Sequence, residues 1–277
     1  MEKSKKEGEK VSFNLSPTSL NTYYQSPLLF YLTYIAKVPD DTPVPVCYGL
    51  SGNIIHACLE KYAKKELDMD EAIIHLATLW EKYNLHSHKD LKGEVLNQEE
   101  YLQALLSGIS IIEKHTDHIC EENINFSLLE NEDFKIGVKG IIDLQTKQKV
   151  DNNKIIIDYK TSNNINIGKE FQRQATFYNY LLYKQKNFIP SKTIFHYLKL
   201  GIPKVYNINI EDIKAFEMEL NEIASQILAF GKDISNYPIG NIYDTFNSKR
   251  QACLNEVSKR KFLNNQISLI NLELDRF

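Results

Sequence analysis

The stretch KGIIDLQTKQKVDNNKIIIDYKT, residues 139–161, decides the fold of this chain. Both of its ends are rich in β-branched residues, and the polar run Lys147–Asn153 separates them. Apolar, β-branched runs bounded by polar residues are typical of β-strands. We therefore predict two neighbouring strands, Phe134–Gln145 and Lys154–Asp158, joined by a hairpin loop.

Each predicted strand carries an aspartate near one end, and the two are 15 residues apart, Asp143 and Asp158. In a hairpin both carboxylates lie near one end of the sheet, where they can hold a hard divalent cation such as Mg²⁺. Such an ion polarises a phosphodiester and helps to generate hydroxide from water. Side chains alternate along a strand, so Lys160 lies on the same face as Asp158 and can offset developing charge.

A structural interpretation stands beside this chemical one. An aspartate that ends an apolar strand is usually a solvated boundary residue or a helix cap, and an isolated Asp-x-Lys tripeptide is common. The apolar run before Asp158 and the preceding Gly-x-x-Asp strand both favour the catalytic interpretation.

Composition allows a soluble globular protein with a sizeable core: 277 residues, 43% hydrophobic and 25% charged. The net charge of −3 argues against a large surface that coats DNA, but it says little about a narrow cleft. The start has no apolar core and no run of about 18 apolar residues occurs, so we expect a cytoplasmic protein with no membrane partner. No Cys-x-x-Cys pair occurs, and we interpret all four cysteines as reduced thiols, Cys47, Cys58, Cys120 and Cys253.

The N-terminal half is predicted to be mainly helical after a disordered tail at residues 1–12. Ser16-Pro17 and Ser26-Pro27 each place a capping hydroxyl before a proline at the first helical position. A proline-containing loop follows at residues 37–47. The predicted helices are Thr18–Gln25, Leu28–Ala36, Gly49–Glu66, Asp70–Tyr83 and Gln98–Glu122.

The second half combines strands with helices. The turn Gly201-Ile202-Pro203 separates two further strands. Beyond the hairpin we predict strands Asn125–Leu129, Thr193–Leu200 and Lys204–Ile210, and helices Gly168–Lys184, Glu211–Asp233 and Ser248–Phe262. This segregation predicts an α/β, α+β-like fold with a small mixed central sheet flanked by helices and with helical N- and C-terminal regions. We expect a helical region at 13–123, a sheet-and-helix core at 124–210 and C-terminal helices at 211–277.

Short motifs resemble those of the PD-(D/E)XK nucleases. GIID at 140–143 and DYK at 158–160 resemble the second and third motifs of that superfamily. QATFY at 174–178 is similar to the Gln-x-x-x-Tyr motif of its RecB-like branch, and GNIIHACLE at 52–60 to the branch's Gly-x-x-x-His helix. SPTSL at 16–20, with Tyr23 and Ser26-Pro27, resembles the branch's N-terminal signature. The matches keep the family's order over residues 16–178.

The resemblance implies roles for individual residues. It assigns metal binding to His56, Asp143, Asp158 and the backbone carbonyl of Tyr159, catalysis to Lys160, and contact with the substrate backbone to Gln174 and Tyr178. For His56, Gln174 and Tyr178, which lie on predicted helices, a purely structural role also stays open. A lone histidine on an apolar helix is more often a core residue, and Gln174 and Tyr178 can be ordinary interface residues that share one helix face.

The implied activity is that of an Mg²⁺- or Mn²⁺-dependent DNA nuclease, an exonuclease acting on DNA ends or single strands in recombination, repair, or phage or CRISPR-type processing. A helicase or recombination protein is the implied partner. Many relatives carry an iron–sulfur cluster held by one cysteine near the N-terminal signature and three near the C-terminus. Here Ser26 precedes Pro27 and the C-terminal region offers only Cys253, so we expect no cluster.

Two other classes of function stay open. The first is a catalytically inactive DNA-end-binding or scaffold subunit with the same fold, which would bind DNA without metal-dependent cleavage. The second is an unrelated enzyme with a fortuitous Asp-x-Lys, in which Asp143 and Asp158 would lie far apart.

Overall fold

The computed structural model of the protein describes residues 10–163, 165 and 168–274, with side chains as far as residue 263. The chain divides into two compact units. The first unit comprises Met1–Val44, Phe126–Val138 and Asn221–Phe277, and the second comprises Pro45–Asn125 and Lys139–Leu220. Residues 1–9 of the expected disordered tail lie outside the described residues.

Among the described residues, six strands form a mixed sheet. Their hydrogen-bonded order is β1-β3-β4-β5-β6, and β2 also pairs with β3. The β1–β3 and β4–β5 pairs are parallel, whereas the β3–β4 and β5–β6 pairs are antiparallel. The strands are β1 (Val11–Leu15), β2 (His115–Glu130), β3 (Phe134–Gln148), β4 (Lys154–Lys160), β5 (Lys192–Tyr197) and β6 (Ile202–Tyr206). The predicted fold class, a mixed sheet with helices around it, is confirmed.

Strand β4 pairs with a strand on each side, and the second unit covers both of its faces. Ile157 lies opposite Leu144 of β3 and opposite Ile194 of β5. The residues from Ile155 to Tyr159 are all buried. A strand that is paired and covered in this way has a continuous apolar sequence, which explains the isoleucine run before Asp158.

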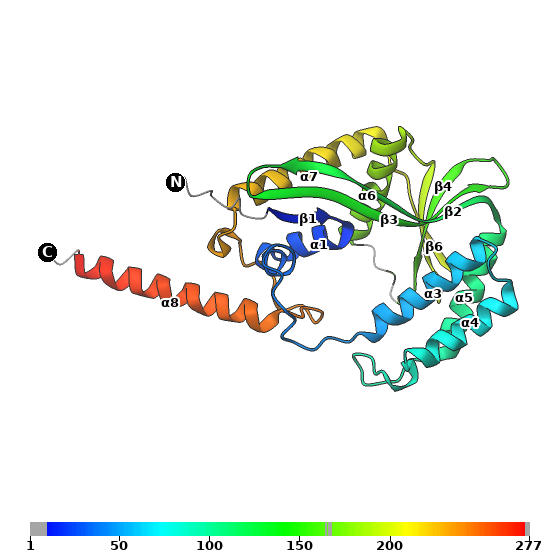
Figure 1. Cartoon of the computed structure of the whole chain (residues 1–277), viewed down its shortest axis with the longest axis horizontal. Coiled ribbons are helices and arrows are strands. Elements are labelled where there is room, and N and C mark those ends of the chain that lie inside the picture. Colours follow the sequence, from blue (N-terminus) through cyan, green and yellow to red (C-terminus); the bar gives the residue numbers. More distant parts are fainter. Residues whose placement is uncertain (1–9, 164, 166–167, 275–277) are drawn as a thin grey trace, which may run out of the picture. The chain divides into compact units, whose positions relative to one another are not determined.

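Helices α3 (Cys47–Ala63), α4 (Met69–Lys82) and α5 (Gln98–Glu113) lie side by side in the second unit (Figure 1). They share a buried apolar cluster with Ile155, Ile157 and Tyr159. Asp68 and Glu71 form a capping box that fixes the start of α4. These helices therefore cover the face of β4 that its odd-numbered residues occupy.

Helix α6 (Lys169–Lys186) covers the face that the even-numbered residues of β4 occupy. It packs closely on β3, because a Cβ added at Gly140 would lie 2.5 Å from Leu181 Cδ1 and 3.1 Å from Phe177 Cε1. The glycine of the GIID stretch thus permits the approach of α6. Together, α3–α5 and α6 enclose the strands that carry Asp143 and Asp158.

The first unit contains the two predicted serine caps. The Ser16 hydroxyl accepts the Ser19 N–H (3.2 Å) at the start of α1 (Pro17–Gln25), and the Ser26 hydroxyl accepts the Leu29 N–H (3.0 Å) at the start of α2 (Pro27–Phe30). A π-helical turn, η1 (Tyr31–Ile35), continues α2. Phe13 of β1 contacts Phe30 edge-on, with ring centroids 5.5 Å apart.

The remaining helical elements are η2 (Leu85–Ser87), α7 (Ile210–Phe230), η3 (Ile234–Asn236) and α8 (Arg250–Leu274). None of the helices that the structure describes is both long enough and apolar enough to cross a lipid bilayer.

The structure corrects two predictions about where strands begin. Residues 11–15 form β1, which pairs in parallel with the start of β3. Residues 11 and 12 are therefore strand and not disordered tail, and the helical region does not begin at residue 13 as predicted. Helix α5 ends at Glu113 and β2 starts at His115, whereas we predicted helix as far as Glu122. The helical repeat ends at Ile112, and β2 is partly exposed on both faces, so no period-two apolar pattern marks it.

A smaller correction concerns β6. It runs over Ile202–Tyr206 and includes Pro203, which we assigned to the turn. Proline is tolerated here because β6 is an edge strand of the sheet. The strand ends before Ile210 because Asn209 caps α7, its side chain accepting the Asp212 N–H at 2.8 Å.

Candidate metal centre

The carboxylate of Asp143, on β3, contacts groups from α3 and β4. Its Oδ2 accepts the backbone N–H of Tyr159 at 2.8 Å and lies 3.4 Å from Nδ1 of His56. The other ring nitrogen of His56, Nε2, lies 3.0 Å from the carbonyl oxygen of Tyr159. The imidazole therefore connects two of the groups expected to bind metal, the Asp143 carboxylate and the Tyr159 carbonyl.

The approach of α3 to β4 depends on a second glycine of the quoted motifs. A Cβ added at Gly52 would lie 3.3 Å from Oγ1 of Thr161, the residue after Lys160. That distance is tighter than an ordinary van der Waals contact. Gly52 is one helical turn before His56, so it brings this part of α3 close to the end of β4.

Glu121 joins this group, although the sequence analysis did not identify it. Ligand atoms of His56, Glu121 and Asp143 all lie within 4.8 Å of one another. Glu121 lies on β2, in a segment that we predicted as helix. Its φ of 50° lies in the left-handed region, which side chains rarely adopt and which is often found at functional sites. The only sequence signal was a pair of adjacent acids before the GIID strand.

Asp158 lies at the centre of a closed hydrogen-bond network on the α6 side of β4. It is 2% exposed. Its Oδ1 lies 2.6 Å from Nζ of Lys160, and its Oδ2 accepts from the Tyr178 hydroxyl (3.0 Å) and from Nε2 of Gln174 (3.3 Å). Gln174 also accepts from Lys160 Nζ (3.0 Å) and donates to the Tyr178 hydroxyl oxygen (2.8 Å).

The network brings three of the predicted site residues, Lys160, Gln174 and Tyr178, to the Asp158 carboxylate. Gln174 and Tyr178 are one turn apart on α6 and point to the same carboxylate, as their spacing predicts. Asp158 does not belong to the group of His56, Glu121 and Asp143, whose atoms lie within 4.8 Å. Its oxygens are directed instead toward Lys160, Gln174 and Tyr178.

Aromatic rings surround the ammonium of Lys160. Its Nζ lies 4.8 Å from the ring centroid of Phe195 and 5.4 Å from that of Phe171. The Lys160 side chain is 19% exposed. Ring faces attract a cation, and they restrict the ammonium to a position beside Asp158.

Asp143 and His56 stabilise each other's charged forms. Burial disfavours the imidazolium, but the Asp143 carboxylate outweighs burial and raises the pKa of His56 to about 9. Burial likewise opposes ionisation of Asp143, but the charge of His56 and the N–H of Tyr159 lower the pKa of that carboxyl. Without a bound cation, His56 is therefore protonated at neutral pH and Asp143 is ionised.

The other two carboxyl groups are harder to ionise. Burial raises the pKa of Asp158, and the nearby charge of Asp143 adds to this effect. Burial and Asp143 together raise the pKa of Glu121 to about 7. The site thus carries more carboxylates than its own cations neutralise, and a divalent cation would relieve their repulsion.

The donor set fits a divalent cation. Carboxylate and carbonyl oxygens are the ligands that Mg²⁺ and Mn²⁺ prefer, and an imidazole is an acceptable additional donor for Mn²⁺. These donors come from α3, β2, β3 and β4, all within the second unit. The ligand atoms of the three-residue group are close enough for one ion to reach them all.

Comparison with known protein families and solved structures gives matches to both. The family model of the PD-(D/E)XK nuclease superfamily matches residues 14–239. No curated protein sequence matches the chain. Among solved structures, a "Putative exonuclease" from Eubacterium rectale is similar, with 10% identity, 82% of this chain and 84% of that chain covered, and a TM-score of 0.46. The protein SSO0001 shows 12% identity, coverage of 78% and 89%, and a TM-score of 0.32.

The family match extends over most of the chain and includes every motif residue named above, from Ser16 to Tyr178. It confirms the resemblance to the superfamily, and this chain belongs to the PD-(D/E)XK nuclease superfamily.

Proposed function

We propose that this protein is a metal-dependent deoxyribonuclease of the RecB-like branch, an exonuclease that acts on DNA ends or single strands with Mg²⁺ or Mn²⁺. One observation supports the proposal most strongly. The closed network of Asp158, Lys160, Gln174 and Tyr178 adjoins a cation-sized group formed by His56, Glu121 and Asp143. Nucleases of this superfamily use divalent metal ions.

In the proposed site, His56, Asp143, Asp158 and the Tyr159 carbonyl bind the ion, and we add Glu121 to these ligands. The bound ion supplies Lewis acidity toward the phosphodiester and makes water a better nucleophile. His56 binds it as the neutral imidazole, so its proton leaves before the ring can donate a lone pair. The Tyr159 N–H holds Asp143 in place throughout.

Lys160 is the proposed catalytic lysine. Its ammonium, held by Asp158 and Gln174 at 2.6 and 3.0 Å, faces the position where charge develops on the phosphate. Gln174 and Tyr178 fix the second oxygen of Asp158 and line the surface along which the substrate backbone lies. Hydrolysis then breaks one P–O bond, and its products are a phosphate group and a free hydroxyl.

We extend the proposal to the organisation and setting of the protein. The helical region 13–123 supplies the His56 helix, the core at 124–210 supplies the remaining motif residues, and 211–277 completes the fold. We expect the protein in the cytoplasm, with a helicase or recombination protein as its partner on DNA. Cell fractionation and purification of an epitope-tagged protein would test both points.

End-labelled single- and double-stranded DNA tests the activity directly. The purified protein is incubated with each substrate in Mg²⁺, Mn²⁺ or EDTA, with matched RNA as a further substrate. We expect metal-dependent shortening from an end of DNA. DNA binding without cleavage in any divalent ion would instead favour the scaffold class of function. Cleavage that persists in EDTA would overturn the proposal.

A further inference from the structure

A pocket of about 450 Å³ lies in the second unit, away from the Asp158 network. Residues of β2, β3 and β4, the C-terminal part of α6 and the segment after α6 form its walls. Three lysines and several apolar side chains line it, among them Lys147, Lys154, Lys186, Ile119, Leu182 and Phe188. This volume and mixture of side chains are typical of sites for small organic ligands.

The pocket is basic although the chain as a whole is acidic. Its lining includes three lysines and one carboxylate, Asp117, in a protein of net charge −3. Lys147 pairs with Asp117 at 2.5 Å, and Lys186 pairs with Glu122 at 2.6 Å. Lys154 has no ion-pair partner within the described part of the chain. Its positive charge is therefore available to an anionic ligand.

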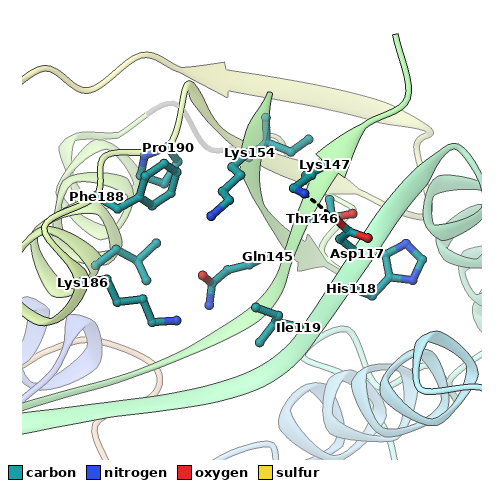
Figure 2. Close-up of a pocket in the computed structure, with 12 residues that line it drawn as sticks. Asp117, His118, Ile119, Gln145, Thr146, Lys147, Lys154, Lys186, Phe188 and Pro190 are labelled. Carbon is teal, nitrogen blue, oxygen red and sulfur yellow. Dashed lines mark ion pairs between the residues drawn. The ribbon is translucent and has the colours of Figure 1, made fainter. Parts of the chain in front are cut away.

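Several polar side chains of the pocket point toward one space. Figure 2 shows the amino groups of Lys154 and Lys186 and the amide of Gln145 on one side of the pocket, beside the ring of Phe188. Lys186 and Gln145 both donate to the carboxylate of Glu122, whereas Lys154 does not. Lys154 Nζ lies 4.9 Å from the centroid of that ring. The Lys154 ammonium thus lies against an aromatic ring at one side of the pocket, where it offers a positive charge to a phosphate next to a ring and apolar side chains for a base.

The pocket and the metal centre both use residues of strand β4 and of helix α6. Lys154 lies four residues before Asp158 on the same face of β4, about 13 Å along the strand. Lys186 lies eight residues after Tyr178 on the same side of α6, about 12 Å along the helix. The two paths agree in length, and one DNA strand carries a phosphate about every 3.4 Å of helix axis. The straight separation therefore equals about four stacked nucleotides, but Ile156, between Lys154 and Asp158 on this face of β4, is fully buried. A DNA strand that reaches both sites must run over the surface and needs more nucleotides than this.

We propose that this pocket binds a nucleotide unit, with its phosphate on Lys154 and Lys186 and its base against Phe188 and Leu182. The same chemistry is present in a nucleotide of the DNA strand and in a free mononucleotide. The spacing favours the strand, and in that form the inference rests on the proposed nuclease function.

Binding measured in EDTA separates the pocket from cleavage. Fluorescent oligothymidylates of 3 and 12 nucleotides are titrated over a series of NaCl concentrations, and dAMP binding is followed by saturation-transfer NMR. The variants are Lys154→Ala, Lys186→Ala and the charge-retaining Lys154→Arg. Lys214→Ala, an exposed lysine of α7 that does not line the pocket, is the matched control.

For the strand, we expect Lys154→Ala and Lys186→Ala to weaken binding of the 12-mer by up to about fivefold and to leave the 3-mer unchanged. The slope of log affinity against log salt should become shallower by about 0.7 for each lost phosphate contact. Lys154→Arg and Lys214→Ala should bind like the wild type. Loss of the dAMP signal in Lys154→Ala supports a free mononucleotide as the ligand.

The proposal is overturned if both alanine variants bind every probe like Lys214→Ala. Circular dichroism of each variant excludes misfolding as the cause of a loss. Because no metal is present, a wild type that fails to cleave DNA in Mg²⁺ or Mn²⁺ would defeat the nuclease proposal while leaving these binding results interpretable.

Discussion

The metal centre and the lysine pocket are built on the same strands and on the same helix α6, yet their charges are held in opposite ways. In the metal centre, Asp158 is 2% exposed and is contacted by Lys160, Gln174 and Tyr178. In the pocket, Lys154 is exposed and faces an aromatic ring at 4.9 Å. One region buries its charges among contacting groups of the protein, and the other leaves a positive charge exposed to a ligand.

This difference predicts different responses to mutation. Removing one partner of a buried, hydrogen-bonded charge leaves the other unsatisfied at a cost of several kcal/mol. Removing an exposed lysine loses one screened contact, worth roughly 1 kcal/mol or less. We therefore expect large, salt-insensitive effects in the metal centre and small, salt-sensitive effects in the pocket. The following predictions, from the largest expected effect to the smallest, test that contrast.

Asp158→Asn should reduce cleavage about 1,000-fold, because it removes the charge at the centre of the network while keeping its shape. Asp151→Asn, in the exposed loop between β3 and β4, is the matched control and should retain wild-type kcat/KM. Steady-state cleavage of end-labelled DNA measures both. If the two variants cleave equally well, the site assignment is wrong.

Lys160→Met and Lys154→Met compare two lysines on the same face of one strand. Lys160→Met should lower kcat about 100-fold at every salt concentration, because a charge aimed at the reacting phosphate is lost. Lys154→Met should leave kcat within a few-fold of wild type and should raise KM mainly for long substrates. Equal losses in the two variants would remove the proposed distinction between the regions.

Affinity for Mn²⁺ should rise with pH, by up to about tenfold per pH unit, until His56 loses its proton near pH 9. The pKa of Glu121, about 7, adds to this dependence in the lower part of the range. Calorimetric titration at several pH values measures it. His56→Gln should flatten the profile above pH 7, whereas His86→Gln, an exposed histidine of η2, should not. A flat wild-type profile would contradict His56 as a ligand.

Stability without metal should change with pH in the opposite direction. The folded-state pKa of His56 lies above its ordinary value of 6.5. Its contribution to the free energy of unfolding is therefore complete below pH 6.5 and is lost as the pH rises through about 9. Urea unfolding in EDTA at pH 6.5 and 9 measures the difference. His56→Gln should lose less stability than wild type over this range, and an equal loss would refute the prediction.

Gly140→Ala should destabilise the protein by about 1–3 kcal/mol, because the added methyl meets Leu181 and Phe177 where α6 packs on β3. Both regions depend on that packing. Gly49→Ala is the matched control, since nothing lies within 4 Å of its Cβ position in α3, and it should be neutral or stabilising. Urea unfolding distinguishes them, and a neutral Gly140→Ala would argue against close packing of α6.

Much of the metal centre could be predicted because its signals are local. The isoleucine run identified β4, alternation placed Lys160 on the face of Asp158, and helical spacing put Gln174 and Tyr178 on one side of α6. Each of these inferences needs only the geometry of one element. The family resemblance then suggested His56, which no local pattern distinguishes from a core histidine.

Features that depend on distant partners were missed. Glu121 lies on β2, which is partly exposed on both faces and is interrupted by residues with positive φ, so no alternation marks it. For β1 the alternation is visible, because Phe13 and Leu15 are buried and Asn14 between them is exposed. Its partner, however, begins at Phe134, far along the chain. The lysine pocket likewise exists only once β4 and α6 are packed together.

The contact between His56 and Asp143 has a consequence for how the protein acquires its ion. The imidazolium of His56 already balances the buried negative charge of Asp143, so the protein can stay folded before a cation binds. Binding of the metal ion is then an exchange, in which the ion replaces the proton on His56. Mild acid or a chelator should inactivate such a nuclease reversibly. The protein should stay folded and regain activity when the metal ion is added back.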